Sequence, residues 1–223
     1  MDAQGMANTL WAVSKMGVHD SAFVDVIIGE ARPKLTSFTD QELANTAYAL
    51  AKLGREDKAF MRVLLDIAST RLSAFDAQSL VNILWAIAKM GHKDKFFVSL
   101  VLMEAKPKLL SFTEQALANT VWALATLGHK DTAFMGDCLV AAHAKLSRFS
   151  EKNLANTAWA LATQDYRGKV FVRALLVEAT PKLPGFTMAN VNQMCFALTK
   201  LSIEDPELEH ALEVRRAPLD GAK

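Results

Sequence analysis

Residues 113–131, TEQALANTVWALATLGHKD, decide the fold, because close copies of this stretch recur at a fixed distance along the chain. DAQSLVNILWAIAKMGHKD occupies residues 76–94 and TDQELANTAYALAKLGRED occupies residues 39–57, so the period is 37 residues. Five asparagines and one glutamine mark this period: Asn8, Asn45, Asn82, Asn119, Asn156 and Gln193. The units are 2–38, 39–75, 76–112, 113–149, 150–186 and 187–223. A repeat of this length predicts an α-solenoid, in which neighbouring units bury one another's apolar faces.

Residues that start and stop helices divide each unit into two predicted helices. The first helix is expected to follow a side chain that accepts backbone N–H bonds, namely Thr39, Asp76, Thr113, Ser150 or Thr187. Thr39 and Glu42 match a capping box, whereas the first unit is expected to lack the usual cap. Glycines that tolerate left-handed backbone should end the first helix, at Gly17, Gly54, Gly91 and Gly128. The second helix should run from Asp20, Asp57, Asp94 or Asp131 towards Pro33, Pro107, Pro181 or Pro218.

These signals predict an all-α fold, one α-solenoid domain over residues 2–223 with about twelve helices in helical hairpins. Two columns are expected to form the core at helical spacing: Val13, Leu50, Ile87, Leu124, Leu161 and Leu198 in the first helices, and Phe23, Phe60, Phe97, Phe134, Phe171 and Leu208 in the second. An aromatic column is also assigned to the core, with stacking on bases as the alternative: Trp11, Tyr48, Trp85, Trp122, Trp159 and Phe196.

Composition and motifs give no support to an enzyme. The five histidines lie at His19, His92, His129, His143 and His210, without metal-ligand spacing, and we expect them to face solvent. No phosphate loop, nucleophile elbow or recurring carboxylate pair is present in the sequence. We therefore expect no catalytic residues, no metal and no small-molecule cofactor.

The remaining composition bears on environment. Cys138 and Cys195 are expected to be buried thiols. The first methionine leads directly into the repeat, so we expect neither a targeting segment nor membrane insertion.

One face of the first helix combines amides with lysines. The third, seventh and fourteenth residues of a unit fall on the same side at about 100° per residue. The third residues are Gln4, Gln41, Gln78, Gln115, Lys152 and Ala189, the seventh are the asparagine column, and the fourteenth include Lys15, Lys52, Lys89 and Lys200. Amides that contact bases and lysines that contact phosphates are typical of single-stranded RNA binding. Alternatively, each asparagine bonds a neighbouring unit's backbone in a structural ladder, and each lysine is a solvated helix end.

A second basic column recurs near the end of each unit, at Lys34, Arg71, Lys108, Lys145 and Lys182. One charge per unit could follow one phosphate per nucleotide, so we predict that this column also binds RNA. The formal net charge of +1 is far from the strongly basic balance of many nucleic-acid binders, so RNA binding must depend on local charge.

The pattern L-A-N-T-x-W-A-L-A-K-L-G resembles a known repeat family. Residues 43–54, 80–91, 117–128 and 154–163 are similar to heptatricopeptide repeats and to the octotricopeptide repeats of algal organelle proteins. Proteins of these families are α-solenoids that bind organellar RNA, often with a RAP domain, which nothing after residue 187 resembles. The resemblance implies a non-enzymatic protein of a mitochondrion or plastid. It would act in RNA stability, processing, translation or ribosomal RNA assembly, with single-stranded RNA and other proteins of a ribonucleoprotein as partners.

The fourth residue of each unit varies while its neighbours stay constant, so by analogy with one-base-per-repeat proteins we predict that it sets specificity. The candidates are Glu42, Ser79, Ala116 and Asn153, with Gly5 and Asn190 at the two ends. The rival function is a protein–protein scaffold, because helical solenoids also offer grooves to peptides.

Overall fold

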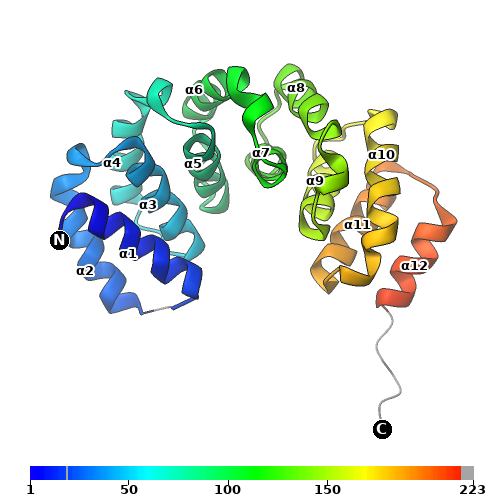
Figure 1. The fold of residues 1–223 in the computed structure, drawn as a ribbon, viewed down its shortest axis with the longest axis horizontal. Helices are drawn as coiled ribbons and strands as arrows, with labels where there is room; N and C mark the ends of the chain where they lie inside the picture. The colour runs from blue at the N-terminus through cyan, green and yellow to red at the C-terminus, as the bar shows by residue number, and fades with distance from the viewer. Residues whose placement is uncertain (19, 217–223) are drawn as a thin grey trace, which may run out of the picture. The chain divides into compact units, whose positions relative to one another are not determined.

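The computed structural model describes residues 1–18 and 20–216, and these contain twelve α-helices and no strands. The predicted all-α helical-repeat solenoid is therefore confirmed (Figure 1). Two compact units are present, Met1–Ser111 and the part from Phe112 onward, and each carries three repeats. Each unit is described by itself, and the continuity of the two as one domain stays a prediction.

The first unit contains three helical hairpins. Its helices are α1 (Ala3–Met16), α2 (Ser21–Ala31), α3 (Asp40–Lys52), α4 (Lys58–Ser69), α5 (Ala77–Lys89) and α6 (Lys95–Ala105). The second unit repeats this plan with α7 (Glu114–Leu127), α8 (Thr132–His143), α9 (Glu151–Thr163), α10 (Lys169–Ala179), α11 (Met188–Leu201) and α12 (Pro206–Arg216). Within each unit, each first helix packs against its own second helix, and successive first helices pack side by side. The middle first helix of each unit, α3 or α9, thus has neighbours on three sides and one side left for solvent.

The predicted helix caps are present. Thr39 and Glu42 form the capping box, and Asp76, Thr113, Ser150 and Thr187 cap their helices. The expectation that the first unit lacks a cap is wrong, because Asp2 accepts a hydrogen bond from Gly5 N at 2.8 Å. Asp20, Asp57, Asp94 and Asp131 cap the second helices as predicted. Side chains thereby satisfy backbone N–H groups at every one of these helix starts.

Left-handed residues end the first helices, as expected from the glycine column. Gly17, Gly54, Gly91 and Gly128 have φ between 64° and 67°. Asp165 and Ser202 keep this conformation in the last two repeats, with φ of 53° and 52°, although both carry a Cβ. The left-handed turn at the end of the first helix is therefore present even in the repeats that have no glycine at this position.

A short 3-10 helix closes five of the repeats and was not predicted. These segments are η1 (Arg32–Ser37), η2 (Leu72–Ala74), η3 (Lys106–Ser111), η4 (Leu146–Arg148) and η5 (Thr180–Gly185). Pro33, Pro107 and Pro181 lie just after the ends of α2, α6 and α10, as expected, while Pro218 and His19 lie outside the described residues. Each segment is followed by a buried phenylalanine that anchors it: Phe38, Phe75, Phe112, Phe149 and Phe186.

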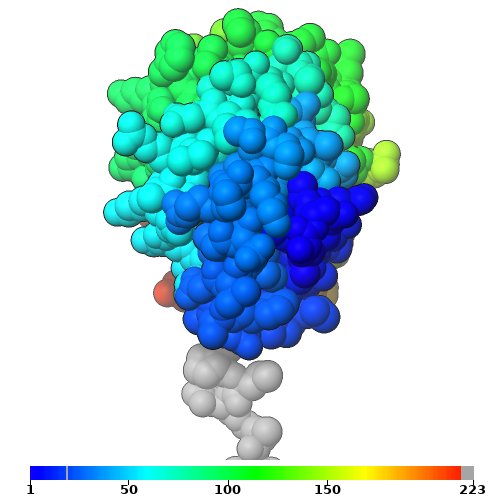
Figure 2. Space-filling view, turned by 90° about the vertical axis from the view of Figure 1, so that its left-hand side faces the viewer, coloured from blue at the N-terminus to red at the C-terminus, as the bar shows by residue number. Residues whose placement is uncertain are grey.

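Both predicted core columns are buried, with one exception. Phe23 is 43 % exposed, whereas its equivalents from Phe60 to Leu208 are buried. Figure 2 shows that α1 and α2, in the darker blues, lie at the surface of the first unit. Within that unit α2 belongs to the terminal repeat, which has a neighbouring repeat on one side only. Phe23 consequently lacks the second neighbour that buries the other members of its column.

Candidate nucleic-acid interface

The open side of the first helices carries four side chains per repeat, at the third, seventh, tenth and fourteenth residues. In the first unit each of the helices α1, α3 and α5 has the same set, glutamine, asparagine, an aromatic residue and lysine. Each set is exposed or half-buried: Gln4, Asn8, Trp11 and Lys15; Gln41, Asn45, Tyr48 and Lys52; Gln78, Asn82, Trp85 and Lys89. This spacing of four, three and four residues places each set along one helix face. We call this surface of the first helices, together with its counterpart in the second unit, the polar-aromatic face.

The asparagine column forms hydrogen bonds between repeats. Asn82 Nδ2 donates to Asn45 Oδ1 at 3.2 Å, and Gln193 Nε2 donates to Asn156 Oδ1 at 3.0 Å. Gln78 Nε2 also donates to Asn82 Oδ1 at 2.8 Å, within one helix. A structural ladder is thus present in part, with one such bond in each unit. Its members bond the amide side chain of the neighbouring repeat, whereas the prediction was a bond to the backbone of that repeat. These bonds use only some of the donors and acceptors of each amide. The ladder therefore leaves other amide N–H and C=O groups available at the surface.

The aromatic column does not belong to the core, so that assignment is wrong. Trp11 is 41 % and Phe196 is 43 % exposed, and the four residues between them in the column are half-buried. In the first unit the rings of Tyr48 and Trp85 are 4.8 Å apart between centroids, at an interplanar angle of 37°. Burial raises the pKa of the Tyr48 hydroxyl, which therefore stays neutral. The rings lie three residues after the asparagines and four before the lysines, a spacing that already places them at the edge of the same helix face.

Lysines complete the polar-aromatic face. The Lys15 ammonium lies 5.1 Å from the centroid of the Trp11 ring and 5.4 Å from that of Tyr48, in the next repeat. These distances fit cation–π contacts, which hold the charge beside the rings. No side chain at the third, seventh, tenth or fourteenth position of any repeat is acidic, whereas five are lysines: Lys15, Lys52, Lys89, Lys152 and Lys200. The face is consequently basic although the chain is nearly neutral.

The second basic column makes contacts within the protein that were not predicted. Lys108 Nζ donates to Phe75 O, Lys145 Nζ to Phe112 O and Lys182 Nζ to Phe149 O, at 2.5, 2.5 and 2.7 Å. Lys34 Nζ donates to Met1 O at 3.1 Å, and Arg71 Nε lies 3.4 Å from Asp40 Oδ1. The partner of Lys34 precedes the first repeat, and Arg71 and Asp40 belong to the same repeat. Lys108, Lys145 and Lys182 join one repeat to the end of the preceding one. Arg215, which the sequence did not single out, does the same at Phe186 O, 2.8 Å away.

Most fourth residues of the units are buried, whereas a residue that contacts a base should be accessible at the surface. Ser79, Ala116, Asn153 and Asn190 are buried, and Gly5 has no side chain. The Glu42 carboxylate accepts from Thr39 N at 2.8 Å, and Asn190 Oδ1 accepts from Thr187 N at 3.1 Å. Glu42 and Asn190 are thus used in helix caps. A specificity role for the column as a whole has no support from this geometry.

A polar cavity of about 380 Å³ opens between the N-terminal ends of α7 and α9. Its lining contains Glu114, Gln115, Asn119, Arg148, Ser150, Lys152 and Asn153. Gln115, Asn119 and Lys152 belong to the polar-aromatic face, which therefore continues into the cavity. Arg148 Nε lies 3.1 Å from Glu114 Oε1, so one wall is an ion pair.

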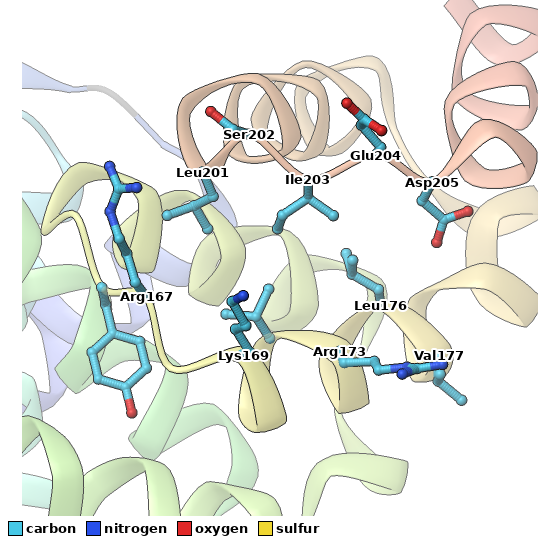
Figure 3. Close-up of a pocket in the computed structure, with 12 residues that line it drawn as sticks. Arg167, Lys169, Arg173, Leu176, Val177, Leu201, Ser202, Ile203, Glu204 and Asp205 are labelled. Atoms are coloured by element: carbon cyan, nitrogen blue, oxygen red, sulfur yellow. The ribbon is translucent and has the colours of Figure 1, made fainter.

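A larger cavity of about 570 Å³ lies between α10 and the loop that joins α11 to α12 (Figure 3). Val172, Leu176, Leu201 and Ile203 supply apolar surface. Figure 3 shows Lys169 and Arg173 on the α10 side and Glu204 and Asp205 on the loop side. The outer side of α10 also exposes Val170 and Val177, at 81 % and 64 %. This region combines apolar surface with both signs of charge.

Cysteines and histidines form no site in the described part of the chain. Cys138 is buried as expected, but Cys195 is only half-buried, which corrects the prediction for that residue. His143 and His210 are exposed, and His92 and His129 are half-buried in their loops. Across residues 1–18 and 20–216, no group of three or more His, Cys, Asp or Glu side chains could hold a metal ion. The same residues include no helix long and apolar enough to cross a membrane.

The repeated helical hairpins define the class of protein, an all-α helical-repeat protein. Within this class, the chain belongs to the family described as Tbc2 translation factor, N-terminal domain, which matches residues 53–203, about two thirds of the chain. No curated protein matches the sequence. The matched segment begins just after α3, in the second repeat, and ends just after α11, in the sixth repeat.

Proposed function

We propose that this protein binds single-stranded RNA along the polar-aromatic face and has no catalytic activity of its own. The observation that carries the proposal is the threefold set of glutamine, asparagine, aromatic residue and lysine on α1, α3 and α5, held in register by contacts between repeats. Single-stranded nucleic acids are bound by surfaces that combine cations with aromatic rings. The absence of acidic side chains from the face lets it attract phosphates despite the near-neutral chain.

Each part of the set has a distinct role in this mechanism. Lys15, Lys52 and Lys89 bind phosphates, and Trp11, Tyr48 and Trp85 offer ring surface on which bases stack. Amides that already bond across repeats use their remaining donors and acceptors towards base edges. Because the ladder fixes these amides before RNA arrives, little side-chain freedom is lost on binding.

The matched family is described by its name as a translation factor, and this supports a messenger RNA as the ligand. We further propose a mitochondrial or plastid location, on the resemblance of the repeat to organellar RNA-binding proteins. In this setting the bound segment would be protected or presented to other proteins of a ribonucleoprotein.

Binding of the purified chain to labelled single-stranded RNA across a salt series tests the proposal. In a variant with Lys15, Lys52 and Lys89 changed to alanine, we expect weaker binding and a salt slope that is smaller by about two, since each phosphate contact on a single strand contributes about 0.7. Lys58, Lys93 and Lys95 are exposed lysines of the same unit outside the face, and their alanine variant is the matched control. Equal losses in both variants, or no binding at low salt, would contradict the proposal.

A protein partner is the second candidate function, and the cavity beside α10 is the observation that favours it. Its apolar surface and the exposed Val170 and Val177 resemble a surface that a polypeptide could cover. A photo-crosslinking residue at position 177 tests this in cells, with position 210 on α12 as the control. A protein adduct specific to position 177 supports the scaffold function, and an RNA adduct there or no adduct counts against it.

A further inference from the structure

The polar cavity between α7 and α9 differs from the rest of the polar-aromatic face because a largely buried asparagine lines it with a carboxamide that has no protein partner. Asn153 is only 8 % exposed and lines this cavity. Its backbone N donates to Ser150 Oγ at 3.3 Å, but its carboxamide makes no hydrogen bond to any residue that the structure describes. Most of the residue is buried, but its carboxamide has no protein partner, so its donor and acceptor capacity is open to water or to a ligand that enters the cavity.

The other fourth residues show that Asn153 is a special case. Asn190 has the same side chain at the same helical position, yet its Oδ1 accepts from both Thr187 N and Thr187 Oγ1, at 3.1 and 2.7 Å. Glu42 is likewise bonded to Thr39 N. Gly5 and Ala116 have no polar side-chain atom, and Ser79 contributes only a buried hydroxyl. Asn153 alone among the six places a free carboxamide in a cavity.

The other lining groups fit a nucleobase better than an anion. Gln115 and Asn119 add two further amides, so the cavity offers donors and acceptors side by side. Every base edge also carries adjacent donors and acceptors, which amides pair with in bidentate geometry. Glu114, although paired with Arg148, disfavours a phosphate inside the cavity. Lys152 and Arg148 are exposed at the rim, where a phosphate of the same nucleotide could lie.

We propose that the cavity between α7 and α9 accepts one base of the bound RNA and that Asn153 determines which base is preferred there. This inference rests on the proposed function, because the RNA must first lie along the polar-aromatic face. On this proposal, only one position of the protein selects a base, whereas the sequence predicted a specificity residue in every repeat. The remaining repeats bind RNA without selecting its sequence.

Enrichment of RNA from a pool with ten randomised nucleotides tests the proposal. The wild-type chain should enrich one base at one position, by about tenfold, which is the discrimination of a single hydrogen-bonded base. Asn153→Ala should abolish this preference and retain binding, since alanine occupies the equivalent helical position at Ala116. Asn192→Ala, which removes an exposed amide of α11 outside the cavity, should leave the preference unchanged.

The outcomes separate the two proposals. RNA binding without base preference in the wild type, or a preference that survives Asn153→Ala, would overturn the role of the cavity and leave RNA binding intact. No enrichment of any RNA by the wild type would overturn both. Should circular dichroism show that Asn153→Ala is unfolded, Gln115→Ala and Asn119→Ala decide, because both alter the same cavity from α7. Loss of the preference in these two variants supports the proposal, and its retention in both overturns it.

Discussion

Lys182 Nζ lies 2.7 Å from the carbonyl oxygen of Phe149 and 2.8 Å from that of Ser147, in the preceding repeat. Ser147 belongs to η4 and Phe149 follows it, so one ammonium group satisfies two carbonyls where a 3-10 helix has ended. Lys108 and Lys145 make the equivalent bond in their repeats. A lysine column that looks like a phosphate-binding series is therefore part of the interface between repeats.

Replacing Lys182 by methionine should lower the free energy of unfolding by about 1–3 kcal/mol, because it removes a charged hydrogen bond and leaves carbonyls unpaired. Urea denaturation measures the change. Lys200→Met, at an exposed lysine of the same unit, should change stability by less than about 0.5 kcal/mol. A loss of RNA affinity in Lys182→Met with unchanged stability would assign the column to phosphates after all.

Replacing Trp11 by alanine should weaken binding of single-stranded RNA by about 1–3 kcal/mol, the usual contribution of one stacked base. Trp11 is 41 % exposed, so the variant should remain folded. Filter binding or fluorescence anisotropy measures the affinity. Trp11→Phe keeps a ring and should recover part of the loss. Equal affinities for wild type and Trp11→Ala would show that this ring does not stack on RNA.

Ser202→Gly should stabilise the second unit by about 1 kcal/mol, because glycine adopts the left-handed backbone at φ 52° without a Cβ penalty. Thermal unfolding should show a higher Tm. The reciprocal change Gly128→Ser, at φ 64°, should lower it. A lower Tm in Ser202→Gly would mean that the serine side chain stabilises the folded state by more than its left-handed backbone destabilises it.

The two thiols should differ in reactivity. Burial, followed by the Asp137 and Asp131 carboxylates, raises the pKa of the Cys138 thiol, and burial also raises that of Cys195. A thiol reagent should modify Cys195 first and Cys138 only on unfolding, since Cys138 is fully buried.

The raised pKa of Cys138 also predicts a pH dependence. Above the pH at which an ordinary thiol ionises, the unfolded chain loses a proton that the folded chain keeps, so stability should fall as pH rises. Cys138→Ala should remove this part of the decline, which unfolding curves at several alkaline pH values would show. An identical decline in the variant would assign it to other groups.

Much of the architecture was predictable because it depends on local chemistry that recurs every 37 residues. Thr39, Asp76 and Ser150 cap helices through atoms three residues away, and the glycine column ends helices through backbone conformation alone. Such effects need no knowledge of neighbouring repeats. The 3-10 segments were missed because they depend on phenylalanines that become buried only in the assembled repeat.

The candidate interface was predictable in its position but not in all its members. The exposed side of the first helix follows from a period of 3.6 residues, which placed Gln41, Asn45 and Lys52 together. The rings of Tyr48 and Trp85 were misassigned because burial of an aromatic residue depends on how closely the next helix approaches. The carbonyl partners of Lys108 and Lys182 were not predictable for a similar reason, as they lie 33 residues away in the chain.

By itself, the sequence determined the repeat, the helical hairpins and the candidate members of the two core columns and of the open face, since all of these follow from helix-capping chemistry and helical periodicity within a few residues. Only the tertiary structure decided which cations join neighbouring repeats, which amides pair across them and which amide remains free in a cavity. These contacts form between side chains that come together only when the repeats pack against one another. A lysine or an amide side chain is long enough to bind either a neighbouring repeat or a ligand.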